Sequence, residues 1–230
     1  MRRMLCTVAL CLAVAWPAEA DVEAGMAAYN AGDYAAALNA FQADAAAGNA
    51  DAQAALGIMY ARGEGVQKDM VVAASWFGKA AEQGHVRAQH LLARIYHSGA
   101  AGERDVSKAI YWFDRASAQG FPYSQLALLS IYYKGDGVPK DLGKAAEYAR
   151  LASEAGLVEA QLQYGYMLLN GEGVERQPRE AYFWLFLVAQ QGLQDGISML
   201  TQISEDDVSS EERLAIERRA LAWKARQTPQ

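Results

Sequence analysis

Two glycine-rich stretches are the first candidates for chemistry. Residues 63–69 read GEGVQKD and residues 135–141 read GDGVPKD, and each precedes a helix-like run. The free N–H groups at a helix N-terminus can bind phosphate. A phosphate-binding P-loop needs Gly-x-x-x-x-Gly-Lys-Ser/Thr, however, and the sequence has no such string. An aspartate stands where each following helix would begin and would repel phosphate, so we interpret both stretches as turns.

The histidines and paired carboxylates match no catalytic or metal-binding motif. His90 and His97 are seven residues apart, or about 10 Å along a helix, which is too far for a two-histidine metal site. The carboxylate pairs at 206–207 and 211–212 lie where a helix starts and are interpreted as capping charges. His-Glu-x-x-His, Ser-x-x-Lys and Gly-x-Ser-x-Gly motifs are absent from the sequence. We expect no catalytic residue, no metal site, no cofactor and no enzymatic activity.

The N-terminus has the pattern of a secretory signal peptide. Two arginines follow Met1, residues 4–16 are mostly apolar, and an Ala-x-Ala site ends at Ala20. This apolar run is shorter than the roughly 20 residues that a membrane-spanning helix needs, and no other stretch is long enough. The sequence predicts cleavage after Ala20 and a periplasmic or secreted protein without a membrane span. A retained membrane anchor is the alternative.

The predicted mature chain is acidic and lacks cysteine. Cys6 and Cys11 both lie in the segment to be removed, so no disulfide, cysteine-ligated metal or cysteine nucleophile is expected. That segment also holds two of the 21 Lys and Arg and one of the 27 Asp and Glu, which leaves 19 against 26 and a formal charge of −7. An acidic chain has no general electrostatic reason to bind nucleic acid, and none is predicted as a partner.

A period of 36 residues organises the rest of the chain. Four units follow one another without insertion, and each predicts two helices. In the first unit, Leu56, Gly57 and Tyr60 form a helical stripe in which Gly57 permits a close neighbour. Gly63 suits the end of that helix, and Asp69 suits the N-cap of the next. The recurring columns include Leu56/Leu92/Leu128/Tyr164, Gly63/Gly99/Gly135/Gly171, Ala73/Ala109/Ala145/Ala181 and Trp76/Trp112/Tyr148/Trp184. We expect the last column to be core, with Trp112 buried between units.

The repeated pattern A-x-x-x-L-G-x-x-Y-x-x-G-x-G-V-x-x-D-x-x-x-A-x-x-W-x-x-x-A-A-x-x-G resembles the Sel1-like repeat family, relatives of the tetratricopeptide repeat. The resemblance covers residues 50–192 and implies an all-α fold, a right-handed superhelical solenoid of antiparallel helix pairs. Unit two departs from the pattern at 99–105, where no valine follows the second glycine.

The flanks of the four units are expected to cap the stack. Residues 21–49 predict an N-terminal helix pair, and residues 193–230 predict C-terminal capping helices, the last from Ser209 to about Arg226. Terminal repeats need polar outer faces. We expect this last helix to cover the stack with Leu214, Ala215, Leu221 and Ala222 and to expose Glu211, Glu212, Arg213, Arg218, Arg219 and Lys224.

The candidate binding residues lie on the first helix of each unit. If the units stack as tetratricopeptide relatives do, the first helices line a concave groove. Arginine can hold a carboxylate with two hydrogen bonds, and arginine and tyrosine are favoured at interfaces. The alternative is a solvated face without function. The predicted partner-binding residues are Arg87, His90, Arg94, His97, Tyr123, Tyr133, Lys134, Tyr166 and Asn170.

Three functions compete at this stage. The first is a non-catalytic scaffold or adaptor of the bacterial cell envelope or secreted space, which binds a protein or peptide segment in the groove. The second is a hydrolase similar to β-lactamases, as described for cysteine-rich relatives, although the serine motif and the helix-pair disulfides are missing. The third is a solenoid that binds a small ligand or glycan. Fold alone does not decide among them.

Overall fold

The computed structural model describes residues 22–227, and in this range every regular element is a helix. The predicted signal peptide lies outside the described residues. The helices are α1 (Val22–Asn30), α2 (Tyr34–Ala46), α3 (Ala50–Arg62), α4 (Met70–Glu82), α5 (Val86–Ser98), α6 (Val106–Ala118), α7 (Pro122–Lys134), α8 (Leu142–Glu154), α9 (Val158–Asn170), α10 (Pro178–Ala189), α11 (Gln194–Leu200) and α12 (Ser210–Gln227).

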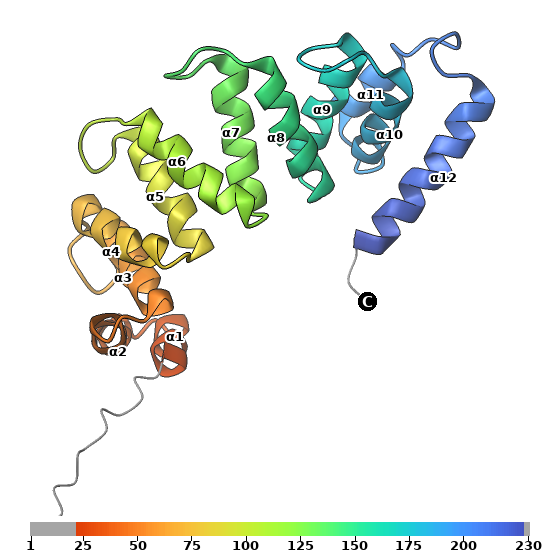
Figure 1. Cartoon of the computed structure of the whole chain (residues 1–230). Coiled ribbons are helices and arrows are strands. Elements are labelled where there is room, and N and C mark those ends of the chain that lie inside the picture. Colours follow the sequence, from red (N-terminus) through yellow and green to blue (C-terminus); the bar gives the residue numbers. More distant parts are fainter. Residues whose placement is uncertain (1–21, 228–230) are drawn as a thin grey trace, which may run out of the picture.

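The helices form an arch of stacked pairs (Figure 1). Helices α3, α5, α7 and α9 are the first helices of the four units, and α4, α6, α8 and α10 are the second helices. Helices α4, α6 and α8 each pack between their own first helix and that of the next unit, and α10 packs between α9 and the C-terminal helices α11 and α12. The helix pair α1–α2 stands at one end of the arch and α12 at the other (Figure 1). The predicted all-α solenoid of antiparallel helix pairs is confirmed.

The glycine-rich stretches are the turns between paired helices. Gly63 and Gly135 end their helices in the left-handed conformation, at φ of 77° and 71°, which glycine adopts without steric cost. The Asp69 side chain accepts hydrogen bonds from the N–H groups of Val71 and Val72, at 2.8 and 3.0 Å. The helix terminus that could have bound phosphate is therefore already occupied by a carboxylate.

The deepest core column consists of phenylalanines rather than tryptophans. Phe41, Phe77 and Phe113 are at most 2% exposed, and they project from the second helices toward the first helices. The expectation of a buried Trp112 is wrong, because Trp112 is only half-buried and has the Arg115 guanidinium 5.6 Å from its ring centre. The expectation of a core column holds at its last member, since Trp184 is 4% exposed and its ring centre lies 6.0 Å from that of Tyr164 on α9.

A buried glutamine recurs on each first helix, and it was not among the residues predicted from the sequence. The Gln89 side chain donates to the carbonyl of Ala81, at 3.0 Å, and Gln53 donates to Ala45 in the same way. The amide thus satisfies a carbonyl at the C-terminus of the preceding second helix. The signal was present in the period, since glutamine recurs at positions 53, 89, 125 and 161.

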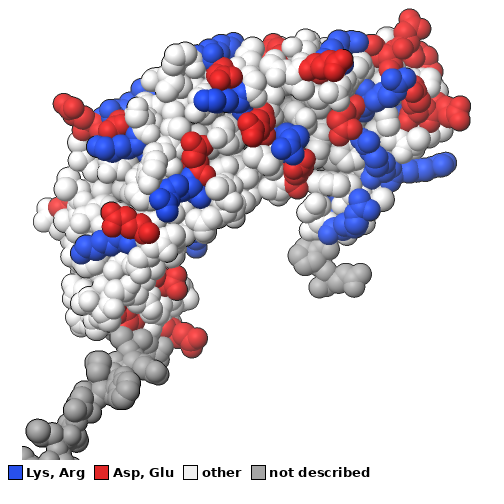
Figure 2. All heavy atoms as spheres, in the orientation of Figure 1, with Lys and Arg blue, Asp and Glu red and all other residues white. Residues whose placement is uncertain are grey.

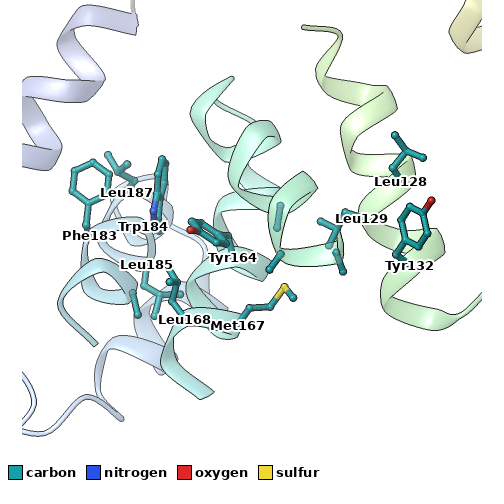
Figure 3. Close-up of a cluster of buried hydrophobic side chains, with 14 of the residues drawn as sticks. Leu128, Leu129, Tyr132, Tyr164, Met167, Leu168, Phe183, Trp184, Leu185 and Leu187 are labelled. Atoms are coloured by element: carbon teal, nitrogen blue, oxygen red, sulfur yellow. The ribbon is translucent and has the colours of Figure 1, made fainter. Parts of the chain in front are cut away.

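The last helix covers the stack with a different face from the one predicted. Trp223 packs against Trp184, with ring centres 5.6 Å apart, and Ala220 beside it is fully buried. Leu214 and Leu221 are 56% and 50% exposed, and Ala215 and Ala222 are exposed as well. Figure 3 shows Trp184 beside Phe183 on α10, the helix against which α12 packs.

Ion pairs with α10 fix this rotation of α12. Glu212 accepts a hydrogen bond from Arg179 at 2.6 Å, and Arg219 donates to Glu180 at 2.6 Å. The Arg219 guanidinium also lies 4.2 Å from the ring centre of Phe183. The expectation that Glu212 and Arg219 face only water is therefore wrong, because each contacts the helix that α12 covers.

Candidate functional site

Predicted site residues line cavities at two separate places on the first helices. The larger one, of about 610 Å³, lies between α3 and α5, and we call it the Arg94 cavity. Its apolar floor includes Ile58, Leu91 and Ile95, and its rim carries basic side chains. A second cavity, of about 310 Å³, lies between α7 and α9 and is lined by Tyr133, Lys134 and five further residues. The predicted site residues therefore do not form one continuous constellation.

The Arg94 cavity brings together three of the predicted residues and two further basic side chains. Arg87, Arg94 and His97 line it, as do Arg62 and Lys68. Arg87 and Arg94 are two helical turns apart on one face of α5. Within residues 22–227, no ion pair involves Lys68, Arg87 or Arg94. These exposed cations are available to an anionic group from outside the chain.

The cavity continues toward the N-terminal helix pair. A neighbouring cavity of about 290 Å³ shares Ile58, Arg87 and Leu91 with the Arg94 cavity and reaches Val22 and Met26 on α1. Together these spaces form a groove across α1, α3 and α5. Elsewhere the charges are mixed: Figure 2 shows Lys and Arg interspersed with Asp and Glu over the visible face, and acidic side chains gathered near the loop between α11 and α12.

His90 does not contribute to the basic rim. Its Nδ1 lies 3.0 Å from Oγ of Ser124, and its ring centre lies 5.0 Å from that of Phe121 and 5.5 Å from that of Phe113. Burial, with a smaller contribution from the nearby charge of Arg94, lowers the pKa of His90 to about 4. His90 is therefore neutral at pH 7, and it joins units two and three rather than presenting charge to a ligand.

His97 is hydrogen-bonded to a carboxylate of the following turn. Its Nε2 lies 2.9 Å from Oδ2 of Asp136, which also receives a hydrogen bond from Arg104. Arg104 in turn donates to the His97 carbonyl at 2.8 Å. The Arg104 hydrogen bond, followed by that from His97, holds the pKa of the Asp136 carboxyl below its usual range. His97 thus lines the Arg94 cavity while its imidazole is hydrogen-bonded to Asp136 in the following turn.

Tyr133 and Tyr166 share one carboxylate. Their hydroxyls donate to Oε2 and Oε1 of Glu172, at 3.0 and 3.2 Å. Burial, together with Glu172, raises the pKa of Tyr133, and the charge of Glu172 raises the pKa of Tyr166. Both hydroxyls are used inside the solenoid, so only the rings and Lys134 beside them remain for a partner.

The last two predicted residues lie outside both cavities. Asn170 donates from Nδ2 to the carbonyl of Tyr166 at 2.9 Å, and so helps to end α9. Tyr123 is 57% exposed, and its ring centre lies 5.8 Å from that of Phe121. Neither residue lines the Arg94 cavity or the space between α7 and α9.

In the range 22–227 no three His, Cys, Asp or Glu side chains cluster closely enough to hold a metal ion. None of the helices in that same range is both long enough and apolar enough to cross a membrane.

Comparison with known proteins identifies the repeat. The Sel1 repeat family matches residues 50–85, 86–121, 123–157 and 158–193. No curated protein matched the chain. Among solved structures, a Sel1 repeat protein from Oxalobacter formigenes is 25% identical with a TM-score of 0.74, over 91% of this chain and 86% of that one.

A second solved structure is c5321, a protective antigen present in uropathogenic Escherichia coli strains that displays an SLR fold. It is 28% identical with a TM-score of 0.69, and the match covers 91% of this chain and 49% of that one, so this chain spans about half its length. The family match extends over more than half of the sequence and coincides with the helix pairs α3–α10. The chain belongs to the Sel1 repeat family.

Proposed function

We propose that this protein is an interaction scaffold of the bacterial cell envelope or the secreted space, and that it binds an extended segment of a partner protein along the groove across α1, α3 and α5. Sel1 repeat proteins are generally protein-interaction scaffolds. The observation that carries the proposal is the pair Arg87 and Arg94, which rim an apolar-floored cavity and form no ion pair within residues 22–227.

The groove supplies the two contributions that a peptide site needs. Its apolar floor can bury aliphatic side chains of the partner, and burial of apolar surface provides most of the binding free energy. Its arginines can hold carboxylates with paired hydrogen bonds and so select the register of the segment. Arginine remains charged at any relevant pH, which makes this part of the recognition insensitive to pH.

The test begins with capture of a partner from an envelope extract, with residues 21–230 as bait, followed by titration of the purified partner. The double variant Arg87→Ala/Arg94→Ala should bind about 1–3 kcal/mol more weakly, and salt should weaken wild-type binding. The urea unfolding midpoint of the double variant should stay close to that of wild type, because both arginine side chains are exposed.

A matched control removes the same charge at the other end of the arch. Arg218→Ala/Arg226→Ala on α12 changes the net charge equally and should leave partner binding unchanged. If the α5 variant binds as tightly as wild type, or if both double variants weaken binding equally, the groove across α1, α3 and α5 is not the binding surface.

The proposed location rests on the signal-peptide pattern and has its own test. Mass spectrometry of the protein recovered from the periplasm or medium should show a chain that begins at Asp21. Recovery of a chain with Met1 intact from that compartment would contradict the proposed processing.

A further inference from the structure

In units one, three and four, the turn between the paired helices bears an acidic residue that is hydrogen-bonded to the first helix of the preceding pair. Unit two is the exception. Asp136 in the α7–α8 turn binds His97 on α5, at 2.9 Å, and Glu172 in the α9–α10 turn accepts from Tyr133 on α7, at 3.0 Å. Glu64 in the α3–α4 turn accepts from Tyr29 on α1. A carboxylate thus bridges the junctions of α1 with α3, of α5 with α7 and of α7 with α9.

At the junction of α3 with α5 the bridge is missing. Ala100 occupies the turn position of Asp136, and Ala61 occupies the first-helix position of His97, 36 residues earlier. Both alanines line the Arg94 cavity. The cavity therefore exists where two small side chains replace the pair that closes the corresponding space in the next unit.

The backbone at this junction keeps the path that it has elsewhere. The N–H of Ala100 donates to the Ile95 carbonyl at 3.3 Å, as that of Asp136 donates to the Ile131 carbonyl at 3.0 Å. Downstream, the N–H of Asp105 donates to the Tyr96 carbonyl at 2.9 Å, as the equivalent aspartate does in unit three. The second glycine of this turn is shifted by one residue, to position 102, but the hydrogen bonds on both sides are conserved. What is lost is the carboxylate and not the turn.

The cation that would bind the missing carboxylate is still present. Arg104 binds Asp136, which follows it by 32 residues, and Lys68 precedes Ala100 by the same number. Lys68 and Arg94 both line the cavity beside Ala100. In the described part of the chain neither forms an ion pair. The junction of α3 with α5 thus retains its cationic side chains and lacks the carboxylate that would pair with them.

We infer that the Arg94 cavity binds a carboxylate of the partner segment at the place that Asp136 and Glu172 occupy in the following junctions, with Lys68 and Arg94 as its cationic contacts. This inference rests on the proposed function and specifies its ligand. The apolar floor formed by Ile58, Leu91 and Ile95 lies in the same cavity. The ligand is therefore a peptide that carries a carboxylate next to a large aliphatic side chain.

The first experiment restores the carboxylate within the chain. Ala100→Asp should raise the melting temperature above that of Ala100→Asn, an uncharged control of the same size, because only the aspartate can pair with Lys68. Adding Lys68→Ala should reduce the difference between the two variants, and adding Lys68→Ala/Arg94→Ala should abolish it. Equal melting temperatures for the aspartate and asparagine variants would show that position 100 does not face the cations.

The second experiment measures binding of fluorescein-labelled, amidated hexapeptide pools X-X-Leu-Glu-X-X and X-X-Leu-Gln-X-X by anisotropy. Wild type should bind the glutamate pool about tenfold or more tightly than the glutamine pool, the difference of one charge-assisted hydrogen bond. Ala100→Asp should lose this preference and Ala100→Asn should keep it. A third pool ends in a free leucine carboxylate and is compared with the same peptides carrying a C-terminal amide. This comparison shows whether a chain terminus can serve as the ligand.

Failure of this inference can be told from failure of the proposed function. If Ala100→Asp binds the captured partner as wild type does while Arg87→Ala/Arg94→Ala does not, the scaffold stands and the carboxylate site falls. Equal binding of all three pools to wild type, or binding of none, would also overturn the carboxylate site. If neither set of substitutions affects partner binding, both proposals are wrong.

Discussion

Gly57 on α3 and Phe77 on α4 are in such close contact that a Cβ added at position 57 would clash with the phenylalanine ring. A Cβ placed on Gly57 would lie 2.5 Å from Cε1 of Phe77. The same relation joins Gly25 with Phe41 in the N-terminal pair, where the distance would be 2.6 Å. The large ring of the second helix thus packs directly on the backbone of the first helix, and this contact sets the spacing within the pair.

Gly57→Ala should destabilise the protein by about 1–3 kcal/mol, because the added methyl group must displace a buried ring in a packed core. Gly78→Ala is the matched control. Gly78 also lies within a helix, but a Cβ there would have no heavy atom within 4 Å, so alanine should be neutral or stabilise by up to about 1 kcal/mol. Urea unfolding of both variants measures the difference, and equal effects would contradict the close packing.

Phe113→Ala should cost more than truncation of the tryptophan beside it. Phe113 is 2% exposed in the largest core cluster, and truncation of a buried aromatic costs about 3–5 kcal/mol. Trp112 is half-buried, so its truncation should cost about 1–2 kcal/mol. Lys140→Ala, on an exposed turn, should cost less than about 0.5 kcal/mol. If Trp112→Ala lowers the urea midpoint as much as Phe113→Ala does, the tryptophan column also belongs to the deep core.

The period of 36 residues predicted the helices, turns and N-caps because these depend on local chemistry. It could not decide which of two adjacent aromatic residues, Trp76 or Phe77, faces the neighbouring helix, since both recur with compatible helical spacing. The face of α12 that packs against the stack could not be predicted from the sequence for a related reason. That rotation depends on contacts of Trp223 and Arg219 with residues of α10, and such contacts are not encoded in the periodicity of α12 itself.

For the candidate site, too, positions on a single helix could be predicted from the sequence, whereas contacts between units could not. Spacing on a single helix placed Arg87 and Arg94 together, and both line one cavity. Spacing could not show that Ser124 and Phe121, from the following unit, would enclose His90. Nor did it show that Glu172, from a turn, would receive both tyrosine hydroxyls. Contacts between units decide which polar side chains remain available to a partner.

Ala155→Gln should stabilise the protein. The buried Oε1 atoms of Gln53 and Gln89 accept from Gln83 and Gln119, each 30 residues later and each at 2.8 Å. Gln125 Oε1 is buried without a hydrogen-bond partner, and Ala155 stands 30 residues after it. A glutamine there should supply the donor and contribute about 0.5–1.5 kcal/mol.

Ala155→Met is the control for this substitution, since methionine has a similar length and no donor. Both variants should be compared with wild type in urea denaturation. A gain with glutamine but not with methionine supports the hydrogen bond, whereas equal midpoints for the two variants would show that the gain, if any, comes from packing alone.

His90 should make the stability of the protein fall as the pH is lowered from about 6.5 to about 4. Burial holds its folded-state pKa at about 4, whereas an unfolded histidine titrates near 6.5. As the pH falls through this window the unfolded chain takes up a proton that the folded chain does not, so the unfolded state gains stability. Above pH 6.5 both states are neutral at this position and the contribution is complete.

The pH dependence of the unfolding free energy of wild type and His90→Asn separates this contribution from other groups. The difference between the two curves should change by at most about 1.4 kcal/mol per pH unit, the limit for one proton, and by less where solvent reaches the ring. Arg94→Ala should reduce the wild-type slope only slightly, because burial lowers the pKa more than the arginine does. Parallel curves for wild type and His90→Asn between pH 7 and 4 would show that His90 is protonated as readily in the folded state as in the unfolded one, and that it is not enclosed between units two and three.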